Sequence, residues 1–271
     1  MRVRKLLVIG LFLLSTVGIW AQESTPIAKV WNKSDHHFSN QIWSVTCDDN
    51  DVAYFGNASG LIRFDSQNWS VTPIKGGSII RSTLYDSGRI YAGSFEEFGY
   101  YETLPNGRLS YTSLSDLLEN YNMNNEEIWN IFRWNELIIF HSFVTIFIFN
   151  PANNDVSFFD TKEFNESIGI DSRNTILSSA HGFSEIDLAS RSVKTIPHPW
   201  KERMVAVLPR EKESDLIVTK NEGIYNWDGV TLRRWATDCD DRLIGGEVNK
   251  AYLTDAGDII IGSSLFGCTA I

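Results

Sequence analysis

The sequence is poor in positive charge, in cysteine and in proline, and each shortage excludes a class of protein. Lysine and arginine number 24 against 34 aspartate and glutamate residues, which gives a formal net charge of −10. Without a basic cluster the chain has no electrostatic hold on phosphate, so we do not expect this region to bind nucleic acid. Seven prolines and 19 glycines in no fixed period exclude collagen-like and low-complexity chains.

Three cysteines without a CxxC pair (Cys47, Cys239 and Cys268) form neither a disulfide framework nor a zinc site. Cys47 alternates with Trp43 and Val45, which predicts a small buried side chain in a strand. We therefore expect no structural metal and no cofactor.

Long apolar runs are also scarce, and the one that is present is N-terminal. Three basic residues, Arg2, Arg4 and Lys5, precede an apolar run over residues 6–20 that ends at the small residue Ala21. This order is typical of a signal peptide, so we predict that residues 1–21 are a targeting segment and that residues 22–271 are exported to the periplasm. An uncleaved membrane anchor is the alternative.

Aromatic residues, in contrast, are abundant. The 9 Trp, 9 Tyr and 16 Phe of this 271-residue chain supply ample material for a core and exclude disorder. They fall into a repeat of four short apolar runs separated by polar turns. The third run of each repeat starts at residues 60, 99, 144, 182, 223 and 267, about every 40 residues, with the fourth repeat the least regular.

A period of this length with four strands in each repeat is typical of β-propeller blades. We predict an all-β propeller of five four-stranded antiparallel blades and a partial sixth, over residues 37–74, 77–113, 124–161, 166–198, 201–237 and 245–271. The one helix-like stretch, residues 113–120, is predicted as an insertion between the second and third blades.

The number of blades leaves the closure of the ring open. Either residues 28–31 supply a missing strand to the last blade, or the chain is a fragment of a longer protein with an incomplete ring. We favour the fragment. Unpaired strands at an open end would favour a homodimer.

Three phrases resemble a known family: NQIWSV at residues 40–45, GNASGLIRFD at 56–65 and GRIYAGSFEEFGY at 88–100. They are similar to two-component-regulator propeller repeats, as found in the periplasmic sensor regions of Bacteroidetes triple-tyrosine-motif transcriptional regulators and hybrid histidine kinases. The resemblance covers residues 38–271 and is weak in the fourth unit. It implies a sensor whose triple-tyrosine domain, membrane helix and output domain would follow this region, so that only those parts would reach the membrane.

The sequence contains no recognised catalytic motif. GxSxG, HExxH, GxGxxG and P-loop patterns are missing from the sequence. The adjacent His36 and His37 would point in opposite directions on an extended chain, and so would Glu96 and Glu97, which makes them a poor chelate and a poor glycosidase pair. The acidic segments 48–51 and 238–241 lack EF-hand spacing and are predicted as turns.

Propeller geometry places ligands over the channel, where the loops between second and third strands meet the starts of the innermost strands. The predicted ligand-binding residues on this face are Trp43, Arg81, Glu96, Glu97, Trp129, His141, His181, Lys220 and Lys250. Such a mixture of aromatic, polar and charged side chains suits a small polar ligand or an oligosaccharide. We expect a non-catalytic sensor; the alternatives are an exported glycan lyase or hydrolase on the same fold, and an interaction scaffold in the cell envelope.

Overall fold

The computed structural model describes residues 30–271 except residues 32, 163–164, 180–181, 202 and 211–212. The predicted signal peptide lies outside the described residues. The chain divides into two units, Met1–His36 and His37–Ile271. In the first, α2 (Lys33–His36) is a single helical turn. No helix among the described residues is long and apolar enough to cross a membrane.

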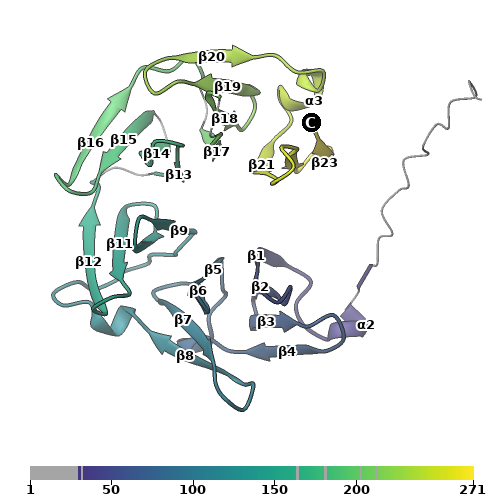
Figure 1. The fold of residues 1–271 in the computed structure, drawn as a ribbon, viewed down its shortest axis with the longest axis vertical. Coiled ribbons are helices and arrows are strands. Elements are labelled where there is room, and N and C mark those ends of the chain that lie inside the picture. Colours follow the sequence, from purple (N-terminus) through teal and green to yellow (C-terminus); the bar gives the residue numbers. More distant parts are fainter. Residues whose placement is uncertain (1–29, 32, 163–164, 180–181, 202, 211–212) are drawn as a thin grey trace, which may run out of the picture. The chain divides into compact units, whose positions relative to one another are not determined.

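The second unit consists of six antiparallel sheets, each a blade of consecutive strands, set around a common axis with the first strand of each blade innermost (Figure 1). Blades 1 to 3 contain β1 (Ile42–Cys47), β2 (Ala53–Asn57), β3 (Gly60–Phe64) and β4 (Trp69–Thr72); β5 (Ser82–Asp86), β6 (Arg89–Gly93), β7 (Phe98–Thr103) and β8 (Leu109–Ser113); and β9 (Asn130–Trp134), β10 (Leu137–His141), β11 (Thr145–Asn150) and β12 (Asp155–Asp160).

Blades 4 to 6 contain β13 (Ser167–Ile170), β14 (Ile176–Ser179), β15 (Phe183–Asp187) and β16 (Ser192–Ile196); β17 (Met204–Leu208), β18 (Asp215–Thr219), β19 (Ile224–Trp227) and β20 (Leu232–Trp235); and β21 (Val248–Leu253), β22 (Ile259–Ser263) and β23 (Gly267–Ala270). A short helix, α3 (Asp240–Leu243), links blades 5 and 6.

The all-β propeller architecture is confirmed, but the predicted count of five blades plus a partial one was wrong. The structure has six blades, of which the sixth has three strands in the order β21-β22-β23. Val30 and Trp31, in the segment considered as a source of the missing strand, form no strand. Residues 28 and 29 of that segment lie outside the described residues.

Tight turns join the strands because short polar side chains satisfy the turn backbone. In the segment 48–51, Asp48 Oδ1 accepts hydrogen bonds from the backbone N–H groups of Asn50, at 2.9 Å, and Val52, at 3.0 Å. The structure therefore confirms that this acidic segment is a turn, closed by its own first carboxylate.

The predicted insertion was only partly right. Ser115–Leu117 forms one 3₁₀ turn, η2, and no helix follows it. Leu118 is extended and Asn120 has a left-handed backbone with φ of 59°, so the helical path ends after one turn. A second 3₁₀ turn, η1 (Lys75–Gly77), links blades 1 and 2.

Apolar cores lie between the blades, because each sheet has two apolar faces that it cannot cover alone. Five clusters of buried side chains fill the five junctions between consecutive blades. The cluster between blades 2 and 3 is the most aromatic, with Tyr91, Phe98, Phe140, Phe147 and Phe149 all at most 1% exposed. Trp227 is 3% exposed in the cluster between blades 4 and 5.

No such cluster joins blade 6 to blade 1 in the described part of the chain. On the facing strands, Val45 of β1 is 60% exposed and Tyr252 of β21 is 65% exposed. We call this junction the seam. It explains why the prediction of a buried Cys47 was wrong: Cys47 follows Val45 on the same exposed strand, and its thiol is free and exposed.

A comparison of Val45 and Val207 tests whether the seam is open, because the two residues occupy matching positions in blades 1 and 5. Each comes two residues after the extra residue of the bulge in its innermost strand, but Val207 packs against the core between blades 4 and 5. We expect Val207→Ala to lower the free energy of unfolding by about 1 kcal/mol or more, and Val45→Ala to change it by less than about 0.5 kcal/mol. Urea denaturation of both variants measures the difference. Equal losses would mean that the seam face of blade 1 is covered in solution.

Candidate functional site

A cavity of about 370 Å³ lies on the axis, and all six blades contribute to its wall. We call it the axial cavity. From blades 1 to 6 in order, its wall includes Trp43, Arg81, Trp129, Glu166, Arg203 and Lys250. A volume of this size is in the range of small-molecule sites.

Local strand geometry turns these side chains toward the axis. Arg81, Trp129, Glu166 and Arg203 each directly precede the innermost strand of their blade. In blades 1 and 6 the innermost strand has a bulge after its first residue, which leaves Trp43 and Asn249 out of register with the second strand. A bulge redirects the side chain of the extra residue, and both of these residues line the axial cavity.

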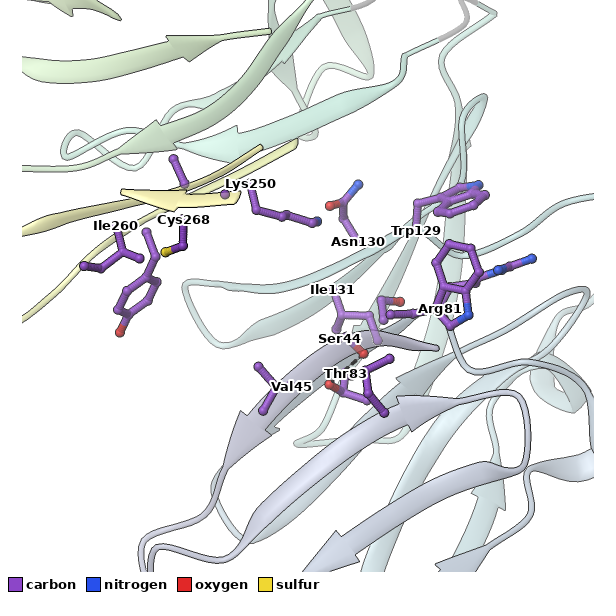
Figure 2. A pocket seen from close by; sticks show the side chains of 16 residues that line it. Ser44, Val45, Arg81, Thr83, Trp129, Asn130, Ile131, Lys250, Ile260 and Cys268 are labelled. Atoms are coloured by element: carbon purple, nitrogen blue, oxygen red, sulfur yellow. Dashed lines mark hydrogen bonds between the residues drawn. The ribbon is translucent and has the colours of Figure 1, made fainter. Parts of the chain in front are cut away.

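A second cavity, of about 560 Å³, continues from the axial cavity along the seam. We call it the seam cavity. It shares Trp43, Arg81, Trp129, Asn130 and Lys250 with the axial cavity. Figure 2 shows its wall, with Lys250 extending from blade 6 and with Arg81 and Trp129 on the far side. Its outer part, toward Ile260 and Cys268, is the more apolar.

Arg81 is the most firmly held cation of the site. Its guanidinium carbon lies 3.9 Å from the ring centroid of Trp43 and 5.2 Å from that of Trp129. Its Nε and Nη2 donate to Oε1 of Glu127 at 3.1 and 3.0 Å, and its side chain is 14% exposed. The buried Nη1 has no acceptor among the described residues. Arg81 is therefore an immobilised cation whose charge is held between two indole rings and one carboxylate.

The aromatic side chains around Arg81 support one another. The rings of Trp129 and Phe143 are stacked, with centroids 5.3 Å apart, and the rings of Trp43 and Trp129 meet edge to face at 6.2 Å. Packing on several sides fixes the two indoles before any ligand arrives, which lowers the entropic cost of binding.

Two further cations reach the axial cavity from blades 5 and 6. Arg203 Nη1 lies 3.0 Å from Oε2 of Glu166. Lys250 has no ion pair within the described part of the chain, and its side chain is exposed to the solvent of the cavity. The protein walls nevertheless desolvate the ammonium group, which lowers the pKa of Lys250, and the charge of Arg203 lowers it further.

Four of the nine predicted ligand-binding residues thus lie together: Trp43, Arg81, Trp129 and Lys250. His181 lies outside the described residues. Lys220 lies apart from both cavities, paired with Oε2 of Glu247 at 2.8 Å.

Glu96 and Glu97 line a different pocket, of about 450 Å³, between the β6–β7 loop and residues 115–123. Glu97 is 6% exposed and accepts hydrogen bonds from the hydroxyls of Tyr111 and Ser113, both at 2.8 Å. Burial and the Glu97 charge raise the pKa of Tyr111. Glu96 is exposed, and its Oε1 accepts from the backbone N–H of Asn125 at 2.7 Å. The two carboxylates bind different partners, although Glu96 has a left-handed backbone with φ of 53° and the predicted extended chain was wrong at this residue.

His141 was predicted in a loop, but it is the last residue of β10 and is 1% exposed. Its Nδ1 lies 3.4 Å from Nδ2 of Asn130, and its Nε2 has no partner among the described residues. Burial lowers the pKa of His141 to about 3, so the ring is neutral at physiological pH. It supports the wall of the cavity from behind through Asn130, which lines both cavities.

Glu166 and Asn130 also line the axial cavity, but we did not predict either as a binding residue. The sequence position of Glu166 could have identified it, because it directly precedes the innermost strand β13, just as Arg81 and Arg203 directly precede the innermost strands of their blades. No group of three or more His, Cys, Asp or Glu side chains in the described ranges is arranged to hold a metal ion.

No protein-family model and no curated protein sequence matches the chain. Solved structures do match. The extracellular domain of BT4673, assigned to a hybrid two-component system of B. thetaiotaomicron, is 14% identical with a TM-score of 0.64, over 87% of this chain and 34% of that one. The corresponding domain of BT3049 from the same organism is 13% identical with a TM-score of 0.63, over 92% of this chain and 35% of that one.

This chain therefore spans about a third of the length of the solved structures that it matches. At this level of identity the comparison establishes the fold. The predicted resemblance to the propeller of such sensor regions is confirmed at that level.

Proposed function

We propose that this chain is the exported ligand-sensing module of a membrane-bound signal-transduction regulator, and that it binds a small polar ligand, such as an oligosaccharide, in the axial cavity without chemical change. The observation that carries the proposal is the axial cavity, which is lined by residues from every blade. A ligand in that position contacts all six repeats, so its binding favours one arrangement of the blades over others.

Two further observations support a sensing role. The solved structures with this fold are extracellular domains assigned to two-component systems. The predicted signal peptide agrees with an exported location. The downstream domains of such a regulator would receive the change in blade arrangement.

The carboxylates beside the axial cavity support binding rather than catalysis. Glu127 holds the guanidinium of Arg81, and Glu166 holds that of Arg203. Each acid thus positions a cation, which is a role in recognition. We therefore propose that the domain releases its ligand unchanged.

A thermal-shift screen of the chain against defined oligosaccharides tests the proposal. A ligand present at 100 times its Kd stabilises a protein by about 2.7 kcal/mol, which for a domain of this size raises Tm by roughly 5–10 °C. We expect at least one oligosaccharide to do so and Arg81→Met to abolish the shift. The matched control is Arg108→Met, which removes an exposed arginine from the β7–β8 turn, away from both cavities.

Chromatography of the incubated ligand completes the test. Recovery of the intact ligand supports a sensor. Cleavage of the ligand by wild type but not by the Arg81 variant would instead show an enzyme at this site. A shift that persists in Arg81→Met would place the binding site elsewhere.

A further inference from the structure

The charges around the axial cavity do not balance, although the chain as a whole is acidic. Three cations face it or flank it, Arg81, Arg203 and Lys250, but only two carboxylates, Glu127 and Glu166, pair with them. Each arginine is paired with one carboxylate, and the ammonium group of Lys250 has no carboxylate partner among the described residues. In a chain with a formal net charge of −10, a surplus cation at the centre of the repeats is a local reversal of sign.

The geometry around Lys250 suits an anion. Lys250 lines both the axial cavity and the seam cavity, so a ligand in either reaches it. Asn130 and Asn249 line the axial cavity as well. Nδ2 of Asn249 donates to Oγ of Ser264 and Nδ2 of Asn130 lies 3.4 Å from Nδ1 of His141, so each amide has one further N–H for a carboxylate or sulfate oxygen. Desolvation of the ammonium by the cavity walls disfavours its charge when no anion is present, and the opposite charge of a bound anion would offset that penalty.

We infer that the ligand of this site is anionic, a saccharide that carries a carboxylate or a sulfate group, and that Lys250 binds this group in the axial cavity. The inference rests on the proposed function, since it specifies the ligand of the same cavity. Arg81 remains in contact with the indoles and Glu127, so its charge is already engaged and Lys250 is the cation left for the anionic group.

The experiment compares acidic oligosaccharides with their uncharged parents. Isothermal titration uses trigalacturonate and its fully methyl-esterified form, and a sulfated disaccharide and its unsulfated form, each with the whole chain. We expect at least one acidic member to bind about 10-fold or more tightly than its uncharged parent, which is equivalent to about 1.4 kcal/mol. Inorganic sulfate at the same concentration should bind far more weakly, because it lacks the saccharide contacts.

Substitutions identify the group responsible. Lys250→Met should remove the preference for the acidic form, whereas Lys250→Arg should keep it. Lys194→Met, which removes an exposed lysine from the outermost strand β16, is the matched control and should behave as wild type. Thermal unfolding of each variant verifies that it is folded.

The outcomes separate this inference from the proposed function. If neutral oligosaccharides bind and charge gives no advantage, the anion inference is wrong and the proposed function stands. If the advantage persists in Lys250→Met, the assignment of Lys250 is wrong. If neither acidic nor neutral saccharides bind to the folded chain, the proposed function fails and the inference fails with it.

Discussion

Replacing Phe98 with alanine should lower the free energy of unfolding by about 3–5 kcal/mol, the usual cost of removing a buried phenylalanine. Phe98 is fully buried between blades 2 and 3, with its ring centroid 4.7 Å from that of Phe140 and 4.9 Å from that of Phe147. Both neighbours lie on strands of blade 3, which limits how far they can move into the void. The aromatic cluster thus packs together the two blades that carry Arg81 and Trp129.

Phe95 provides a matched control for this prediction. It lies three residues before Phe98 and is 39% exposed, so Phe95→Ala should change the free energy of unfolding by less than about 1 kcal/mol. Urea denaturation followed by tryptophan fluorescence measures both variants. A loss below about 1 kcal/mol for Phe98→Ala would contradict tight packing between blades 2 and 3.

Acidification from pH 7 to pH 5 should destabilise the wild-type chain by about 2 kcal/mol more than it destabilises His141→Phe. The folded-state pKa of His141 is about 3 because burial disfavours the charged ring, whereas an unfolded-state histidine has a pKa near 6.5. As the pH falls below that unfolded value, only the unfolded chain binds the proton. Stability due to the neutral ring is therefore complete above about pH 6.5 and declines from there toward pH 3.

Denaturation curves of both proteins at pH 7, 6 and 5 test this prediction. All other titrating groups are common to the two proteins, so the difference between their slopes isolates His141. His141→Gln serves as a second variant should phenylalanine disturb the wall at Asn130. Parallel slopes for wild type and both variants would show that His141 is charged or solvated in the native state.

Much of the architecture was predictable because the strand signals are local. The alternating run at residues 42–47 and the turn at Asp48 needed no distant contact, and the spacing of third strands revealed the repeat. The number of blades was harder to predict. The sequence pattern of the last three strands is the same whether they form a sheet of their own or only part of one.

The site was predictable in part. Arg81, Trp129 and Lys250 were identified from their positions at the innermost strands, but the pairing of Arg81 with Glu127 joins residues 46 positions apart and depends on how blades 2 and 3 pack. His141 was grouped with the loop after an apolar run that ends at Phe140, whereas β10 continues through it. Cys47 has a pattern typical of burial, but burial also requires a neighbouring blade on that side.

The seam would give the proposed ligand a mechanical role. Blades 1 and 6 are the two ends of an arc, and in the described part of the chain no apolar cluster fastens one to the other, whereas Trp43 and Lys250 approach the same cavity from these two ends. A ligand that contacts both residues would link blade 1 to blade 6. Its binding would fix the distance between the terminal blades and so convert occupancy of the cavity into curvature of the arc.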